Sequence, residues 1–196
     1  MPYILPTSVE VEGIQYDITN NGDFRMVLDC FDALGDEELS EDFRVLTSVL
    51  IFYNKFETLD DLPEDTAIVE SLVRQMFWFF NCGQDEDYGS RTKRPLIDWH
   101  KDSQMICSAI NKVANMEVRA LPELHWWTFM GYYMSVGEST LATVVSIRDK
   151  LVNNKKLEKW EREFKRDNPD YFVWNSSTVA DRAAEEWVNE IWNSGG

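Results

Sequence analysis

The segment that most constrains the fold is PELHWWTFMGYYM, residues 122–134, where Glu123 is the only charged residue among five aromatic side chains. Residues three and four apart share a face of a helix. Helical spacing therefore sorts the segment into two apolar stripes, one with Leu124, Trp127, Gly131 and Met134 and one with Trp126, Phe129, Met130 and Tyr133. A helix that is apolar nearly all round has to be buried on nearly all sides.

Two interpretations of this segment stay open at the level of sequence. The first is a central core helix, and the second is a helix that packs through one stripe and receives a partner protein on the other. Trp, Tyr and Met are enriched where proteins bind one another, which makes the second interpretation credible. The residues of this partner-binding hypothesis are Leu124, His125, Trp126, Trp127, Phe129 and Tyr133, with Trp187 and Ile191 near the C-terminus as a further surface.

Charge is segregated along the chain, and this narrows the classes of partner. The formal net charge is −16, from 35 acidic and 19 basic residues. Residues 1–90 hold 20 acidic and 4 basic residues, whereas residues 91–166 hold 9 acidic and 14 basic ones. Because a protein with this net negative charge repels phosphate backbones, we expect no nucleic-acid partner. No apolar run approaches the length of a membrane span, so we expect no membrane insertion either.

The pattern of apolar residues predicts a mainly α fold, a helical domain of about seven to eight helices with a small N-terminal β-hairpin. Alternating residues in SVEVEGIQYDI, residues 8–18, predict the hairpin, with its turn at Glu12 and Gly13. We expect residues 1–83 to hold the hairpin and acidic helices, 84–95 a polar loop, 96–172 the aromatic-motif helical region, and 173–196 a C-terminal helix or tail. These ranges form either one compact domain or two small packed lobes.

Capping residues predict where several helices begin. Asp23 or Asn21, Ser40 and Ser139 are the expected N-caps, and Pro63 is expected in the first turn of another helix. Two apolar stripes are expected to face inward, one made of Phe43, Leu46 and Leu50, with Tyr53 as a further candidate, and one made of Leu157, Trp160 and Phe164. Glu161 and Lys165 are expected to pair on the solvent face of the second of these helices.

Motifs for chemistry are missing from the sequence. There is no Cys-x-x-Cys pair, and His100 and His125 stand 25 residues apart, so no zinc site is expected. Glycine-rich phosphate loops and a nucleophile elbow are also missing. Three widely spaced cysteines are typical of buried free thiols in a reducing compartment. We therefore expect no enzyme activity, no cofactor and no metal.

The aromatic segment and its neighbours resemble a family of siphophage proteins, the gene-product-fifteen proteins. The resemblance is strong over residues 95–172. It lies in Leu124, His125, Trp126, Trp127 and Phe129 for the aromatic motif, Ile147 and Arg148 for the next helix, and Asp98 and Asp102 for the preceding acidic positions. In that family the gene lies between those of the tail tube and the tape-measure protein.

The resemblance implies a tail assembly chaperone in the host cell cytoplasm during phage assembly. Such a protein would bind the long, largely helical tape-measure protein, with the major tail-tube protein and a homo-oligomer as further possible partners. One alternative is a minor structural tail or connector protein that stays in the virion. The other is an enzyme on an unrecognised helical scaffold.

Overall fold

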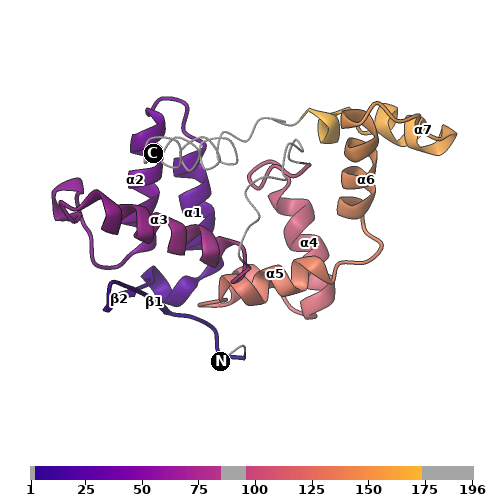
Figure 1. Cartoon of the computed structure of the whole chain (residues 1–196). Coiled ribbons are helices and arrows are strands. Elements are labelled where there is room, and N and C mark those ends of the chain that lie inside the picture. The colour runs from indigo at the N-terminus through magenta and orange to yellow at the C-terminus, as the bar shows by residue number, and fades with distance from the viewer. Residues whose placement is uncertain (1–2, 85–95, 174–196) are drawn as a thin grey trace. The chain divides into compact units, whose positions relative to one another are not determined.

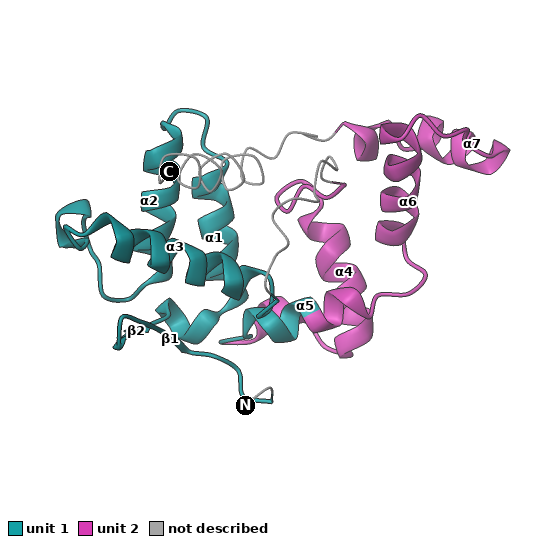
Figure 2. Cartoon of the chain, in the orientation of Figure 1, with its two compact units in different colours: residues 1–91, 123–130, 179–196 teal, residues 92–122, 131–178 magenta. Residues whose placement is uncertain are grey.

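The computed structural model describes residues 3–84 and 96–173, so the predicted surface at Trp187 and Ile191 lies outside the described residues. Within them the chain forms seven α-helices and one two-stranded antiparallel sheet (Figure 1), which confirms the mainly α fold with a small hairpin. The described residues divide into two compact units (Figure 2). Unit 1 holds residues 3–84 and 123–130, and unit 2 holds residues 96–122 and 131–173.

The hairpin of unit 1 has the predicted turn. Strands β1 (Ser8–Val11) and β2 (Ile14–Asp17) pair antiparallel, with Val11 opposite Ile14. Glu12 and Gly13 between them have φ angles of 50° and 75°, and positive φ at both central residues is typical of a two-residue turn that matches strand twist. Tyr16 is buried, and its ring lies 5.9 Å from the Tyr53 ring, so the hairpin contributes side chains to the core of unit 1.

Helices α1 (Phe24–Leu34) and α2 (Glu41–Phe52) pack against each other in unit 1. Asp23 is the N-cap of α1, and its carboxylate accepts the Arg25 N–H at 3.0 Å, as one of the two expected caps predicts. Ser48 of α2 lies in the contact and donates its hydroxyl to the Cys30 carbonyl of α1 at 3.2 Å. The contact therefore combines apolar packing with a buried hydrogen bond.

The predicted inward stripe of α2 is wrong except for its further candidate Tyr53, which is fully buried. Phe43 is 50% exposed and Leu46 and Leu50 are half-buried. The stripe that faces α1 and the core is instead Val45, Ser48, Val49 and Phe52. It is rotated by roughly a third of a turn from the expected one. On this face the buried Ser48 hydroxyl is satisfied by the carbonyls of Cys30 in α1 and Arg44 in α2, and Phe52 fills the core.

Helix α3 (Thr66–Phe80) is the third helix of unit 1. Asp65 is its N-cap, with a carboxylate that accepts the Ala67 N–H at 2.9 Å. Pro63 lies two residues before this cap, so the prediction that it stands in the first helical turn is wrong. Tyr53 is fully buried and donates its hydroxyl to the Leu72 carbonyl at 2.7 Å, which ties the end of α2 to α3. Buried side chains along α3 are Leu72, Val73, Met76, Phe77, Phe79 and Phe80.

Unit 2 is built on helices α4 (Ser103–Ala114), α6 (Thr140–Val152) and α7 (Lys159–Asp167). Ser139 caps α6 by accepting the Ala142 N–H at 3.1 Å, which confirms the predicted start. Helix α5 (Trp126–Met134) carries the aromatic segment, and it starts four residues after Pro122. Its residues up to Met130 belong to unit 1 and those from Gly131 belong to unit 2.

Two predictions about α7 are wrong. Trp160 is 55% exposed, whereas its expected companions Leu157 and Phe164 are half-buried. Glu161, expected on the solvent face, is buried at 2% exposure. Its carboxylate accepts the Lys150 ammonium at 2.6 Å and the Glu158 N–H at 2.8 Å. Both bonds compensate the burial of the charge. The Lys150 bond also ties α7 to α6, whereas the Glu158 bond caps α7 itself.

Candidate functional site

The aromatic motif proposed as a binding surface lies largely inside unit 1. Leu124, Trp126 and Phe129 are at most 9% exposed, and Trp127 is half-buried. The Phe129 ring stacks on the Phe24 ring of α1, with ring centroids 4.5 Å apart and an interplanar angle of 4°. In this conformation the motif acts as core, which is the first of the two interpretations that the sequence left open.

The two adjacent tryptophans have a specific structural task at the end of α3. The Trp126 indole N–H donates to the Phe80 carbonyl and the Trp127 indole N–H donates to the Phe79 carbonyl, each at 2.9 Å. The last carbonyls of a helix have no partner within the helix, and a buried carbonyl without a partner is costly. The pair therefore fills an apolar site and donates to two helix-end carbonyls, of which that of Phe79 also accepts the Cys82 N–H at 3.0 Å.

His125 and Asp23 hold the start of the motif against α1. The Asp23 carboxylate accepts the Leu124 N–H at 2.7 Å, and the Phe24 N–H donates to the Leu124 carbonyl at 2.9 Å. The His125 Nε2 lies 3.0 Å from the Pro6 carbonyl, and its Nδ1 lies 3.1 Å from the Trp127 nitrogen. This places the proton on Nε2, and burial lowers the pKa of the ring. His125 is thus neutral and structural.

Tyr133, the remaining described residue of the hypothesis, belongs to unit 2. It is half-buried, and its ring lies 5.6 Å from the Trp99 ring. Burial raises the pKa of its hydroxyl, with a smaller contribution from the Asp102 carboxylate. Tyr133 therefore belongs to a different compact unit from the other members of the hypothesis, Leu124, His125, Trp126, Trp127 and Phe129, which belong to unit 1. Whether any of these residues binds a partner stays a prediction.

Unit 2 has its own buried polar centre at Arg148 of α6. The guanidinium is 1% exposed and pairs with the Asp102 carboxylate, with Nη2 at 3.0 Å from Oδ1 and Nη1 bonded to Oδ2. It also donates to the Leu96 carbonyl at 2.9 Å and to the Tyr171 carbonyl. Arg148 thus joins the two ends of the described part of unit 2 to α6. The resemblance marked Arg148 and Asp102 separately, but sequence alone gave no sign that they pair.

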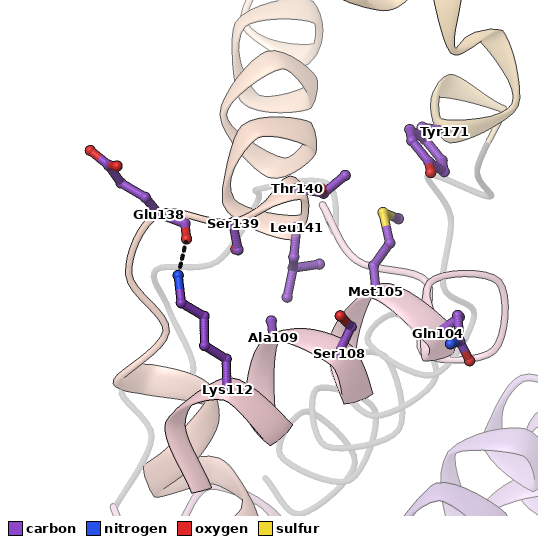
Figure 3. Close-up of a pocket in the computed structure, with 10 residues that line it drawn as sticks. All are labelled: Gln104, Met105, Ser108, Ala109, Lys112, Glu138, Ser139, Thr140, Leu141 and Tyr171. Carbon is purple, nitrogen blue, oxygen red and sulfur yellow. Dashed lines mark hydrogen bonds between the residues drawn. The ribbon is translucent and has the colours of Figure 1, made fainter. Parts of the chain in front are cut away.

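A pocket of about 360 Å³ opens in unit 2 between α4 and the start of α6, and Figure 3 shows its lining. Met105, Ala109 and Leu141 give it an apolar wall, and the exposed Ser108 lies at its edge. At its far side the Lys112 ammonium donates to the Glu138 carbonyl at 3.3 Å. The sequence analysis missed this pocket, because small residues on one helix reveal a hollow only when the opposite helix is known.

The two units differ in charge. Unit 1 has 18 acidic and 4 basic residues among those described, whereas unit 2 has 10 acidic and 11 basic ones. The charge segregation along the chain is therefore also a segregation between compact bodies. Unit 2 is the part of the described chain where a partner meets little electrostatic repulsion.

Metal and thiol chemistry find no support in the described residues. No group of three or more His, Cys, Asp and Glu side chains lies close enough there to hold a metal ion. The three thiols are free, and burial raises the pKa of each, that of Cys82 to about 11, so all three are protonated near neutral pH.

Within residues 3–84 and 96–173, each helix is too short or too polar to cross a bilayer.

Comparison with known proteins identifies the family. The family model described as Bacteriophage Gp15 protein matches residues 3–171, which include both units and the whole aromatic motif. Comparison with curated proteins gave no match, and neither did comparison with solved structures. The match spans most of the 196 residues and confirms the resemblance found in the sequence. The chain therefore belongs to the bacteriophage Gp15 protein family.

Proposed function

We propose that this phage protein is a tail assembly chaperone, which binds the tape-measure protein and promotes polymerisation of the tail tube around it. Membership of the bacteriophage Gp15 family supports a role in building the phage particle. Among such roles, the resemblance over residues 95–172 favours that of a tail assembly chaperone. On this proposal the protein acts in the host cytoplasm and leaves before the tail is complete.

The observation that carries the proposal is the pocket between α4 and α6. A largely helical partner presents apolar side chains every three to four residues along one face. The wall of Met105, Ala109 and Leu141 suits one such side chain, and a flexible Met allows side chains of different shape to fit. A chaperone that contacts many similar turns of a long helix needs this tolerance more than it needs a tight, unique fit.

The contrast in charge between the units supports the same role. The near-neutral unit 2 can approach a partner, while the acidic unit 1 repels other acidic surfaces. A high net negative charge also helps to keep a complex soluble while the partner is not yet enclosed by the tube. The acidic unit is therefore consistent with a protein that shields an aggregation-prone partner.

The direct test is co-purification of the tape-measure protein of the same phage with the full chain. Ser108→Trp fills the pocket edge from an exposed position, so we expect it to reduce the recovered partner about tenfold without unfolding unit 2. Ser146→Trp is the matched control, because Ser146 is exposed on α6 outside the pocket lining. Unchanged recovery with Ser108→Trp would remove the pocket from the proposal.

Mass spectrometry of purified virions tests the alternative of a retained tail or connector protein. The chaperone proposal predicts that the protein is absent from finished particles although it is abundant in infected cells. A fixed number of copies per virion would instead favour the structural alternative.

A further inference from the structure

We infer that copies of this chain associate head to tail, through a basic face on α7 of one copy and an acidic turn on unit 1 of the next. The basic face is defined by Lys159, Trp160 and Arg166 of α7 together with Lys156 of the segment before it, and the acidic turn by residues 36–43. This inference does not depend on binding of the tape-measure protein. It rests on exposure, charge and the position of two exposed aromatic side chains.

The basic face lies on the side of α7 that is turned away from α6. Glu161 holds α7 to α6 through Lys150, and Phe164 is half-buried on the same side. The opposite side is exposed, with 84% of the Lys159 side chain and 72% of the Arg166 side chain accessible. Residues 155–167 contain six basic and four acidic residues, of which Glu161 is buried. Lys159 pairs with Glu163 at 4.0 Å and Arg166 pairs with Asp167 at 2.8 Å, which leaves six basic against three exposed acidic residues. The exposed part of this segment is therefore positive.

Trp160 gives the basic face an aromatic anchor. It is 55% exposed, although a tryptophan has a large apolar ring system that usually gains from burial. The α7 stripe was expected to bury it, and the structure gives that space to Glu161 instead. An exposed Trp beside Lys and Arg is typical of an interaction hot spot.

The acidic turn joins α1 to α2 and carries the complementary features. Between residues 36 and 42 the chain has five acidic residues and no basic one. Glu37, Glu38, Glu41 and Asp42 are exposed, and Phe43, which follows them, is 50% exposed. The first basic residue after them, Arg44, is buried and donates to the Leu39 carbonyl. The surface at this turn is thus negative and carries one exposed aromatic ring, Phe43. The basic face is positive and also carries one exposed aromatic ring, Trp160.

A second copy is the occupant that these charges favour. Nucleic acid and anionic lipid are repelled by the net charge of −16, whereas another copy presents its acidic turn as a local partner. The two surfaces are different, so each copy keeps one surface open after a contact forms. Contacts of this kind produce rings or open chains rather than closed two-fold dimers.

Charge reversal tests the inference with sedimentation velocity on the full chain. The first variant reverses the basic face by combining Lys156→Glu with Lys159→Glu. The second variant reverses the acidic turn by combining Glu37→Lys with Glu38→Lys. All four side chains are exposed, and Lys159 forms a long ion pair with Glu163 at 4.0 Å. Circular dichroism checks that each variant keeps its helices.

The wild type should sediment as a series of species that grows with concentration and shrinks as salt rises from about 50 mM to about 500 mM. Each variant alone should raise the dissociation constant about tenfold or more, because like charges then face each other. Mixing the two variants should restore association, since the reversed basic face of one variant then meets the reversed acidic turn of the other. A chain with all four substitutions should associate like the wild type.

The matched control is Asp60→Lys with Glu64→Lys, which changes the net charge of unit 1 equally. Both residues are exposed and follow the opposite end of α2. This control should associate nearly as the wild type does. A monomeric wild type, variants that associate normally, or a mixture that fails to associate would each overturn the inference.

Discussion

Replacing Arg148 by Met removes the guanidinium from the centre of unit 2 and keeps an unbranched side chain. Asp102, which is 2% exposed, would lose its cationic partner. The carbonyls of Leu96 and Tyr171 would lose their donor at the same time. The substitution therefore leaves one buried charge and two acceptors without the group that satisfies them.

The magnitude follows from the burial of the pair. Removing one partner of a buried ion pair costs about 3–5 kcal/mol, because the other charge stays in a poorly solvated site. The Asp98 N–H still donates to the Asp102 carboxylate at 3.0 Å, which retains part of its solvation. We therefore expect a loss near the lower end, about 3 kcal/mol of the unfolding free energy of unit 2. This is a large share of the stability of a small domain.

Hydrogen exchange across a urea series is the suitable assay, because it reports α4 and α6 separately from unit 1. Arg148→Met, Asp102→Asn and the double variant form a double-mutant cycle. The double variant should be more stable than Arg148→Met alone, since Asn carries no charge that needs a partner. A loss below about 1 kcal/mol for Arg148→Met, or purely additive effects in the cycle, would refute the reasoning.

Three further predictions concern unit 1. Gly83→Ala should destabilise it by more than about 1–2 kcal/mol, since Gly83 has a φ of +77° and a Cβ there would lie 2.7 Å from the Trp127 ring. Thermal unfolding measures this loss, and an unchanged melting temperature would contradict it. Lowering the pH from about 7 to about 5 should destabilise the wild type, because the lowered pKa of His125 means that the unfolded chain, with its ordinary pKa of about 6.5, takes up the proton first. His125→Gln should flatten this dependence in urea titrations, and a slope equal to that of the wild type would exclude His125 as the cause. Val49→Ala should cost about 2 kcal/mol, because it removes buried methyl groups from the face of α2 that packs on α1, and a negligible loss in urea unfolding would contradict that placement.

Local signals in the sequence predicted the features that depend on neighbouring residues. The hairpin turn follows from Glu12 and Gly13, and two helix starts follow from Asp23 and Ser139, because a turn or a cap requires particular residues at fixed positions. The face that a helix buries depends on the partner helix. On α2, the stripe with Phe43 looked as apolar as the stripe with Val49, and only contact with α1 decides between them.

The candidate site was less predictable, for a similar reason. The aromatic density of residues 122–134 correctly indicated burial, but the task of Trp126 and Trp127 at the carbonyls of α3 requires the ends of two distant helices to meet. Glu161 shows the same limit, since its charge suggested the solvent face and only Lys150 explains its burial. The pocket between α4 and α6 is a property of two facing helices and has no motif of its own.

We propose that unit 2 binds a tape-measure protein through the pocket between α4 and α6. A photo-crosslinking amino acid placed at Ser108 in infected cells, followed by mass spectrometry of the crosslinked product, tests it most directly. We expect crosslinks to the tape-measure protein from Ser108 and few from the control position Ser146. Crosslinks to other proteins only, or equal yields from both positions, would contradict it.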